Sequence, residues 1–282
     1  MVENRPLLAF LTHLVLIVGV VIVVFPVYLA FIASTHGSGD FMRGLVPLLP
    51  GPHLIENYRK MLTEGISTAG APPLWIMLTN SLIIAIIIAV GKIAISLLSA
   101  YAIVFFKFPF RMVAFWIIFI TLMLPIEVRI IPTFAVVANL GLLNSYVGLT
   151  LPLIASATAT FLFRQFFLTV PDELMEAARV DGAGPMKFFR DILLPLSRTN
   201  IAALFVILFI YGWVQYLWPL LVTTDSKYYT VVMGIKRLAA TADSEPQWNF
   251  VMAAVMLAML PPVLVVIFMQ RLFVKGLVET EK

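Results

Sequence analysis

Long apolar stretches alternate with short polar segments along the whole of this chain. Six of these stretches have the length of a helix that crosses a membrane: residues 10–33, 75–98, 112–131, 147–168, 200–222 and 250–270. A hydrocarbon core of about 30 Å takes about 20 helical residues to cross. The pattern therefore predicts an all-α polytopic membrane protein with six transmembrane helices, in a single transmembrane domain over residues 1–282.

The composition agrees with a location in a lipid bilayer. Apolar residues make up 61% of the 282 residues and charged residues 12%, against about half and about a quarter in soluble domains. Cysteine is absent, which excludes disulfides, thiolate metal sites and cysteine nucleophiles. The net charge of +4 follows from the sidedness of the basic residues described next, so it predicts no nucleic-acid partner.

The basic residues are divided unevenly between the two sides that six crossings create. Eleven of the nineteen lie on the side of the N-terminus: Arg5, Lys107, Arg111, Arg164, Arg179, Lys187, Arg190, Arg198, Arg271, Lys275 and Lys282. Because Lys and Arg are enriched in cytoplasmic loops, both termini are predicted to be cytoplasmic. Residues 34–74, which are rich in Gly and Pro, then form an extracytoplasmic loop region, with a short helix expected near residues 56–63.

The third apolar stretch is interrupted by proline. Pro125 and Pro132 lie in it or at its end, with Glu127 and Arg129 between them. Interrupted spans are tolerated where the backbone faces protein or a water-filled cavity, so a gate is expected here. On an extended stretch, Glu127 and Arg129 would share a face and form a charge pair.

A polar, charged segment at residues 169–199 lies between the fourth and fifth apolar stretches, on the predicted cytoplasmic side. Pro171 suits a helix start and Gly182 a left-handed C-terminal cap, which predicts a helix of about three turns between them. One face of that helix carries Leu174, Ala177, Ala178 and Asp181. The two small alanines would let another protein come close, and a second short element is expected at residues 186–193. The alternative is a solvated connector between two spans.

Five polar residues are candidates for a solute pathway or gate: Lys92, Glu127, Arg129, Thr160 and Gln215. Ionisable groups at membrane depth are costly, so they are often functional. Each also has a structural alternative. The Lys92 side chain can snorkel or pair with a partner chain, Glu127 and Arg129 can pair with each other, and Thr160 and Gln215 can form interhelical hydrogen bonds.

Three segments carry a resemblance to a known family: residues 161–167, 171–174 and 176–195. The last of them begins with Glu-Ala-Ala, contains Gly182 and ends with Leu-Leu-Pro. Together they resemble the permease subunits of carbohydrate-uptake ABC importers, with a maltose-permease-like fold. Within that group, residues 123–129, 156–160 and 216–221 are similar to permeases for sn-glycerol 3-phosphate, and the resemblance runs from Glu3 to Lys282. One departure is Val214, since the family commonly has Asn after the tryptophan that stands here at Trp213.

The resemblance implies a permease subunit of an importer in a bacterial inner membrane. Its partners would be a homologous second permease, two copies of a cytoplasmic ATPase and an extracytoplasmic solute-binding protein. The implied solute is sn-glycerol 3-phosphate, and a sugar, a polyol or a glycerophosphodiester remain alternatives. The residues implied to contact the ATPase are Glu176, Ala177, Ala178, Asp181, Gly182 and Ala183.

The chain itself is expected to be neither an ATPase nor any other enzyme. It has no phosphate-binding loop, because Gly91-Lys92 is followed by Ile93 and lacks the earlier glycine. ATP and Mg²⁺ would therefore be bound by the partner ATPase, and no cofactor by this chain. One alternative is an ion-coupled secondary transporter, which would explain the spans but not the segment at residues 169–199. Another is an intramembrane enzyme, which would need a nucleophile with a base or a carboxylate dyad, and the spans lack both.

Overall fold

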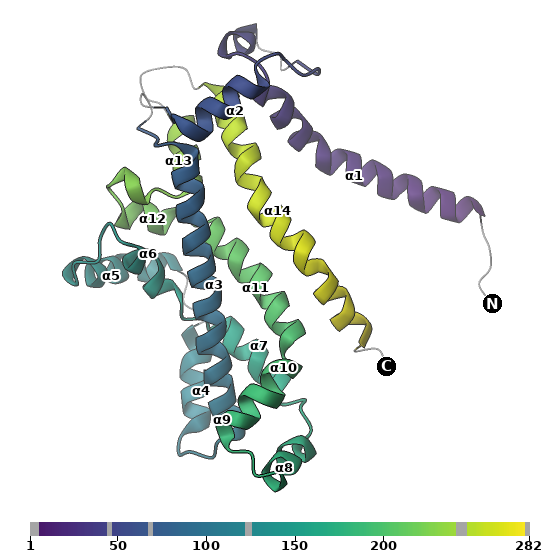
Figure 1. Cartoon of the computed structure of the whole chain (residues 1–282), viewed down its shortest axis with the longest axis vertical. Coiled ribbons are helices and arrows are strands. Elements are labelled where there is room, and N and C mark those ends of the chain that lie inside the picture. The colour runs from purple at the N-terminus through teal and green to yellow at the C-terminus, as the bar shows by residue number, and fades with distance from the viewer. Residues whose placement is uncertain (1–5, 44–46, 67–69, 122–125, 241–246, 280–282) are drawn as a thin grey trace. The chain divides into compact units, whose positions relative to one another are not determined.

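The computed structural model describes residues 6–43, 47–66, 70–121, 126–240 and 247–279 (Figure 1). At a few of these, Glu127 among them, only the backbone is described. Within these ranges the regular structure is helical, and the one β pairing is an isolated antiparallel bridge between Ile66 and Ala71. The prediction of an all-α protein is confirmed.

The chain divides into two compact units. The first comprises residues 1–76 and 234–260, and the second residues 77–233 and 261–282. The helices that lie mainly in the first unit are α1 (Pro6–Ser34), the 3₁₀ helix η1 (Ser38–Arg43) and α2 (Leu54–Thr63). The helix α14 (Trp248–Glu279) begins in the first unit and ends in the second.

In the first unit, α2 covers the end of α1. The buried Asn57 on α2 donates through Nδ2 to the backbone oxygens of Ser34 at 2.9 Å and His36 at 2.8 Å. Its Oδ1 accepts from Asn249 Nδ2 at 3.2 Å. These bonds satisfy carbonyl groups that a helix end leaves without partners. The helix predicted near residues 56–63 is confirmed as α2.

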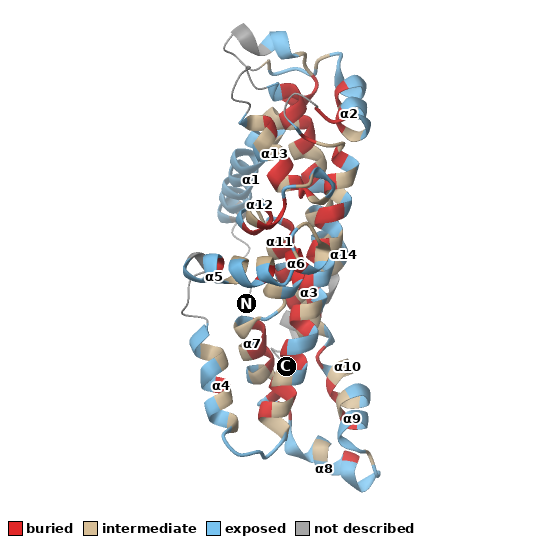
Figure 2. Ribbon diagram, turned by 90° about the vertical axis from the view of Figure 1, so that its left-hand side faces the viewer, coloured by how far each residue is buried: buried red, intermediate tan, exposed pale blue. Residues whose placement is uncertain are grey.

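The second unit contains most of α3 (Leu74–Phe105) and the elements that pack around it. These are α4 (Arg111–Ile120), α5 (Ile126–Asn139), α6 (Tyr146–Thr150), η4 (Leu151–Leu153), α7 (Ala157–Phe167), α8 (Asp172–Val180), α9 (Pro185–Phe188), the π-helical turn η5 (Phe189–Leu193), α10 (Leu194–Leu196), α11 (Arg198–Trp213), α12 (Leu217–Val222), η6 (Ser226–Tyr228) and the start of α13 (Val231–Ala239). Buried residues recur along α3 in Figure 2. That helix is therefore the central element of the unit.

Small residues set the distance between α3 and α11. A Cβ atom built on Gly212 of α11 would lie 2.8 Å from the Cα of Ala85 on α3. Such close approach of two backbones is typical of membrane helices that pack through small residues. Nearby, the fully buried Ile88 belongs to an apolar cluster with Leu149 and Trp218, and Trp218 Nε1 donates to the Gly148 carbonyl at 3.1 Å.

The described chain contains three helices long and apolar enough to cross a membrane: Phe10–Ser34, Leu74–Phe105 and Trp248–Gln270. Two pairs of helices pass the same test together but are bent: Tyr146–Leu153 with Ala157–Phe167 by 47°, and Pro185–Leu196 with Arg198–Trp213 by 72°. Counting each pair as one span gives up to five. The predicted six remain a prediction.

The fifth predicted span does not form one helix over residues 200–222. Helix α11 ends at Trp213, and α12 starts afresh at Leu217. Pro219 gives a physical reason, because it lacks the N–H group that would bond to the Gln215 carbonyl and its ring clashes with that carbonyl in a continuous helix.

The third predicted span also differs from expectation. Residues 122–125, which include Pro125, lie outside the described residues, but α5 begins at Ile126 and continues through Pro132. The expected extended stretch with Glu127 and Arg129 on one face is therefore wrong, since residues two apart on a helix point in different directions. The side chain of Glu127 lies outside the described part of the structure.

Candidate functional site

Helix α8 forms where the sequence predicts it. Pro171 stands at the N-cap with extended backbone (φ −61°, ψ 139°), and Asp172 and Glu173 occupy the first turn, where acidic side chains complement the helix dipole. Figures 1 and 2 both show α8 and α9 at the C-terminal end of α3, with α9 beside its last turns. The helix of about three turns expected between Pro171 and Gly182 is confirmed.

Gly182 ends α8 in a Schellman motif. Its φ is +72°, and its N–H donates to the Arg179 carbonyl at 3.0 Å. The N–H of Ala183 donates to the Ala178 carbonyl at 2.8 Å. These are the two bonds of that motif, and the left-handed position favours glycine. The predicted cap is therefore confirmed.

The faces of α8 differ from the predicted arrangement at one position. Leu174, Ala177 and Asp181 are exposed, whereas Ala178 is only 4% exposed and lies against this chain's own side chains. The expected surface with two free alanines is wrong for Ala178. Gly182 and Val180 are exposed, with Val180 at 88%, so the outer side of the helix remains open to a partner. Glu176 is exposed too, but it lines the cavity described below.

A second short helical element follows α8, as expected near residues 186–193. It consists of α9 and the π-helical turn η5, which widens the helix immediately before Pro195. Pro195 cannot donate the backbone hydrogen bond that a regular α-helix needs at this point, which explains the local change.

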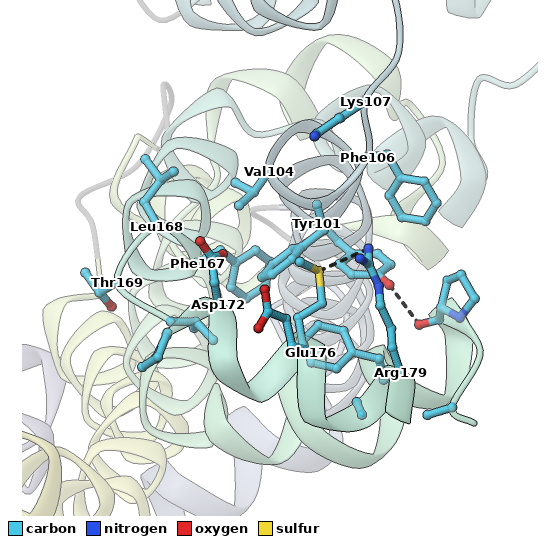
Figure 3. A pocket seen from close by; sticks show the side chains of 18 of the residues that line it. Tyr101, Val104, Phe106, Lys107, Phe167, Leu168, Thr169, Asp172, Glu176 and Arg179 are labelled. Atoms are coloured by element: carbon cyan, nitrogen blue, oxygen red, sulfur yellow. Dashed lines mark hydrogen bonds between the residues drawn. The ribbon is translucent and has the colours of Figure 1, made fainter. Parts of the chain in front are cut away.

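A cavity of about 1020 Å³ lies between α8 and the end of α3 (Figure 3). Charged side chains of both signs line it: Lys107, Arg111, Asp172, Glu176 and Arg179. The Tyr101 hydroxyl donates to the Pro185 carbonyl at 2.8 Å, and Arg179 Nη2 donates to Met175 Sδ at 3.6 Å. The Tyr101 bond joins α3 directly to the start of α9.

An aromatic cluster supports the same junction. The Tyr101 ring lies with its centroid 5.0 Å from that of Phe189 and 5.2 Å from that of Phe106. Phe105 contacts Phe188 at 5.4 Å and Phe167 at 6.0 Å. Contacts of this kind add to the free energy gained by burying the rings. The segment at residues 169–199 is thereby packed firmly onto α3 and α7.

Replacing Tyr101 with Phe tests the polar part of this junction. The ring contacts remain, but the hydrogen bond to Pro185 is lost, at a cost of about 0.5–1.5 kcal/mol. If the segment has the coupling role that the resemblance implies, the expected result is a lower ratio of solute transported to ATP hydrolysed in the reconstituted complex. Tyr58→Phe is the matched control, since it removes a hydroxyl bonded to Ser34 Oγ at 2.9 Å elsewhere. Equal ratios in all three proteins would contradict the assignment.

A second, smaller cavity of about 270 Å³ brings together two of the predicted pathway residues, Arg129 and Gln215. Val214, which stands where the family commonly has Asn, lines it as well. Gln215 has a structural task too, because its Nε2 donates at 3.1 Å to the Tyr211 carbonyl near the end of α11. In a longer helix the backbone N–H of residue 215 would fill that role.

The other predicted pathway residues lie elsewhere. Lys92 is buried at 7% exposure, with its Nζ 3.9 Å from the centroid of the Tyr211 ring. Thr160 is also buried, and its hydroxyl donates to the Ser156 carbonyl at 2.9 Å, so it does not join Arg129 and Gln215. Within the part of the chain that the structure describes, no group of three His, Asp or Glu side chains could hold a metal ion.

Tyr101 and Tyr211 are two contact-forming residues that the sequence reasoning missed. Both are tyrosines within long apolar stretches. A hydroxyl in such a stretch must find a hydrogen-bond partner when it is buried, and that signal could have marked Tyr101.

Comparison with known proteins places this helical membrane chain in a class. The family model described as "Binding-protein-dependent transport system inner membrane component" matches residues 92–279. The chain belongs to this family, and it is therefore a membrane-spanning permease component of an ABC importer, a system that in general includes a partner permease, an ATPase and a binding protein.

Proteins named sn-glycerol-3-phosphate transport system permease protein UgpE are similar over their full length. The one from Agrobacterium fabrum is 61% identical over 282 residues, and the one from Salmonella typhi is 58% identical; each match covers 100% of both chains. A chain in the crystal structure of a bacterial ABC transporter involved in the import of the acidic polysaccharide alginate has a TM-score of 0.81 at 19% identity. That match covers 96% of this chain and 98% of the other, and it shows the shared fold.

Proposed function

We propose that this chain is one permease half of an importer that carries sn-glycerol 3-phosphate across the bacterial inner membrane, using ATP hydrolysed by a separate subunit. The observation that carries the proposal is the identity of 58–61% over the full length to relatives named for the transport of this solute. Identity at that level over both whole chains favours a shared solute.

The rest of the assembly follows from the same proposal. The chain would span the membrane six times with both termini in the cytoplasm, and residues 34–74 would face an extracytoplasmic binding protein. A homologous second permease would complete the pathway, and two copies of the ATPase would supply the energy. ATP and Mg²⁺ would be held by the ATPase.

In this proposal residues 169–199 are the coupling segment. The exposed Ala177 and Asp181 on α8 and the turn at Gly182 and Ala183 would sit against the ATPase. Glu176, which is exposed but lines the cavity next to α3, would contact the ATPase from there. The inward side, with Ala178, faces the cavity next to α3. Movement of the ATPase would reach the spans through the Tyr101 bond to Pro185 and the aromatic cluster, because these contacts join the segment to α3.

Uptake of labelled sn-glycerol 3-phosphate by proteoliposomes tests this function. The vesicles carry the complete complex and its binding protein, with and without this chain, and ATP inside them. We expect uptake that needs both the chain and ATP, persists when ionophores collapse ion gradients, and is not reduced by excess maltose or glycerophosphocholine. Dependence on an ion gradient in place of ATP would contradict the importer mechanism, and transport of only another solute would contradict the solute assignment.

A further inference from the structure

Two basic residues of the second unit stand in apolar stretches of the chain, Lys92 and Arg129. Lys92 lies on α3 and is 7% exposed, whereas Arg129 lies on α5, is exposed and lines a cavity. Among the side chains that the structure describes, no carboxylate forms an ion pair with either one. An anion that binds beside these side chains would be attracted by their positive charge.

The surroundings of Lys92 hold its ammonium group in a defined position. The Lys92 ammonium lies over the Tyr211 ring at 3.9 Å, an attractive contact that strengthens when water is excluded. Tyr211 in turn is fixed from the other side, where its carbonyl accepts from Gln215 Nε2 at 3.1 Å. The close contact of Gly212 with Ala85 brings this part of α11 onto α3. Lys92, Tyr211 and Gln215 thus form one connected arrangement.

An empty space adjoins this arrangement. The cavity of about 270 Å³ is lined by Arg129, Gln215, Thr133 and Tyr216, with the apolar Leu153 and Trp218 completing its wall. A guanidinium presents a fork of donors that matches the oxygens of a phosphate. A carboxamide carries two N–H donors, and Gln215 uses one of them for the Tyr211 carbonyl. The space therefore offers donors and positive charge to a small anion.

We propose that Arg129 and Gln215 form an anion-binding subsite in this half of the permease, which takes the phosphate group of a phosphate monoester during transport. Lys92 and Tyr211 lie behind it as positioning residues, and Lys92 adds positive potential without lining the cavity. This inference rests on the proposed function for the identity of the solute, but the anion site itself rests on the chain's own side chains.

Equilibrium binding of radiolabelled sn-glycerol 3-phosphate to the complex of both permeases and the ATPases in lipid nanodiscs tests the subsite. We expect Arg129→Gln to weaken binding at least tenfold and Arg129→Lys to weaken it less, because a lysine keeps the charge but not the fork. Lys92→Met should weaken binding by a smaller factor. Lys236→Gln on α13 is the control, since it removes an exposed positive charge outside the cavity and should leave binding unchanged. Inorganic phosphate should compete, and glycerol at the same concentration should not.

A second variant keeps the test informative if Arg129→Gln fails to assemble. Gln215→Glu replaces the side-chain amide with a carboxylate of the same size beside Arg129. Because that carboxylate repels the phosphate, the variant should weaken binding at least tenfold in an assembled complex. Normal binding in Arg129→Gln or Gln215→Glu would overturn the subsite.

The same experiment separates failure of the subsite from failure of the proposed function. If the unmodified complex neither takes up nor binds sn-glycerol 3-phosphate, the proposed solute is wrong. Binding of labelled inorganic phosphate to the same complex then tests the subsite alone. Phosphate that binds to the ATPases is present in both complexes, so the amount bound by the Arg129→Gln complex is subtracted from the amount bound by the unmodified one. A remaining Arg129-dependent signal supports the anion site, and no difference between the two complexes refutes it.

Discussion

Replacing Gly182 with Val should abolish most solute uptake while the chain still inserts into the membrane. The φ of +72° at this position costs a residue with a Cβ about 1–2 kcal/mol, and a β-branched side chain fits least well. Free space around the Gly182 Cα, with nothing within 4 Å of an added Cβ, means that the cost is one of backbone strain alone. A penalty of that size corresponds to a factor of about 5–30 in the population with a correctly closed turn.

The measurement is ATP-driven uptake by the reconstituted complex, alongside ATP hydrolysis and the amount of chain in the membrane. Gly184→Val is the matched control two residues away, because Gly184 has φ −69° and ψ 167° and likewise nothing within 4 Å of its added Cβ. Extended backbone of this kind accepts valine, so its uptake should stay near normal. If both variants transport equally well, the turn at Gly182 has no part in coupling.

Replacing Gly212 with Leu should destabilise the protein strongly. An added Cβ at this position would already lie 2.8 Å from the Cα of Ala85, and the backbone cannot move aside as a flexible side chain can. Overpacking typically costs about 1–3 kcal/mol, and a leucine against backbone belongs at the upper end or beyond it. We expect a lower apparent melting temperature in detergent, a lower yield of assembled complex, and loss of uptake in proportion.

Gly19→Leu is the control for this second change. Gly19 is also a helical glycine in an apolar stretch, but nothing lies within 4 Å of its added Cβ. Its melting temperature should therefore stay close to that of the unmodified protein. Equal melting temperatures for the two variants would show that α3 and α11 are not in the close contact described above.

Local chemistry explains why some features could be predicted from the sequence. The turn at Gly182 depends on bonds within six residues, and the start of α8 at Pro171 depends on the conformation of one proline, so both signals are contained in the segment itself. The apolar length of α3 is likewise a property of one stretch of chain. These features needed no knowledge of what lies across the fold.

Features that depend on distant residues could not be predicted in the same way. Whether Ala178 faces outward depends on how α8 packs against other helices, among them α3, whose Tyr101 lines the same cavity. The end of α11 at Trp213 depends on a competition between apolar periodicity and Pro219, and periodicity alone favours the longer helix. The joining of Arg129 to Gln215 in one cavity depends on the break before α12, which leaves Gln215 outside a regular helix.

The position of Tyr101 and Lys92 on one helix has a consequence for the timing of transport. Nine residues of α3 separate them, a rise of about 13.5 Å, and the Ala85 contact with Gly212 holds α11 against the same helix. A displacement at the Tyr101 end would reach the Tyr211 and Lys92 end without any intervening flexible loop. In the proposed mechanism, movement of the ATPase at the Tyr101 end and a change at the proposed anion subsite would then be linked mechanically through α3, and we expect the two to occur together.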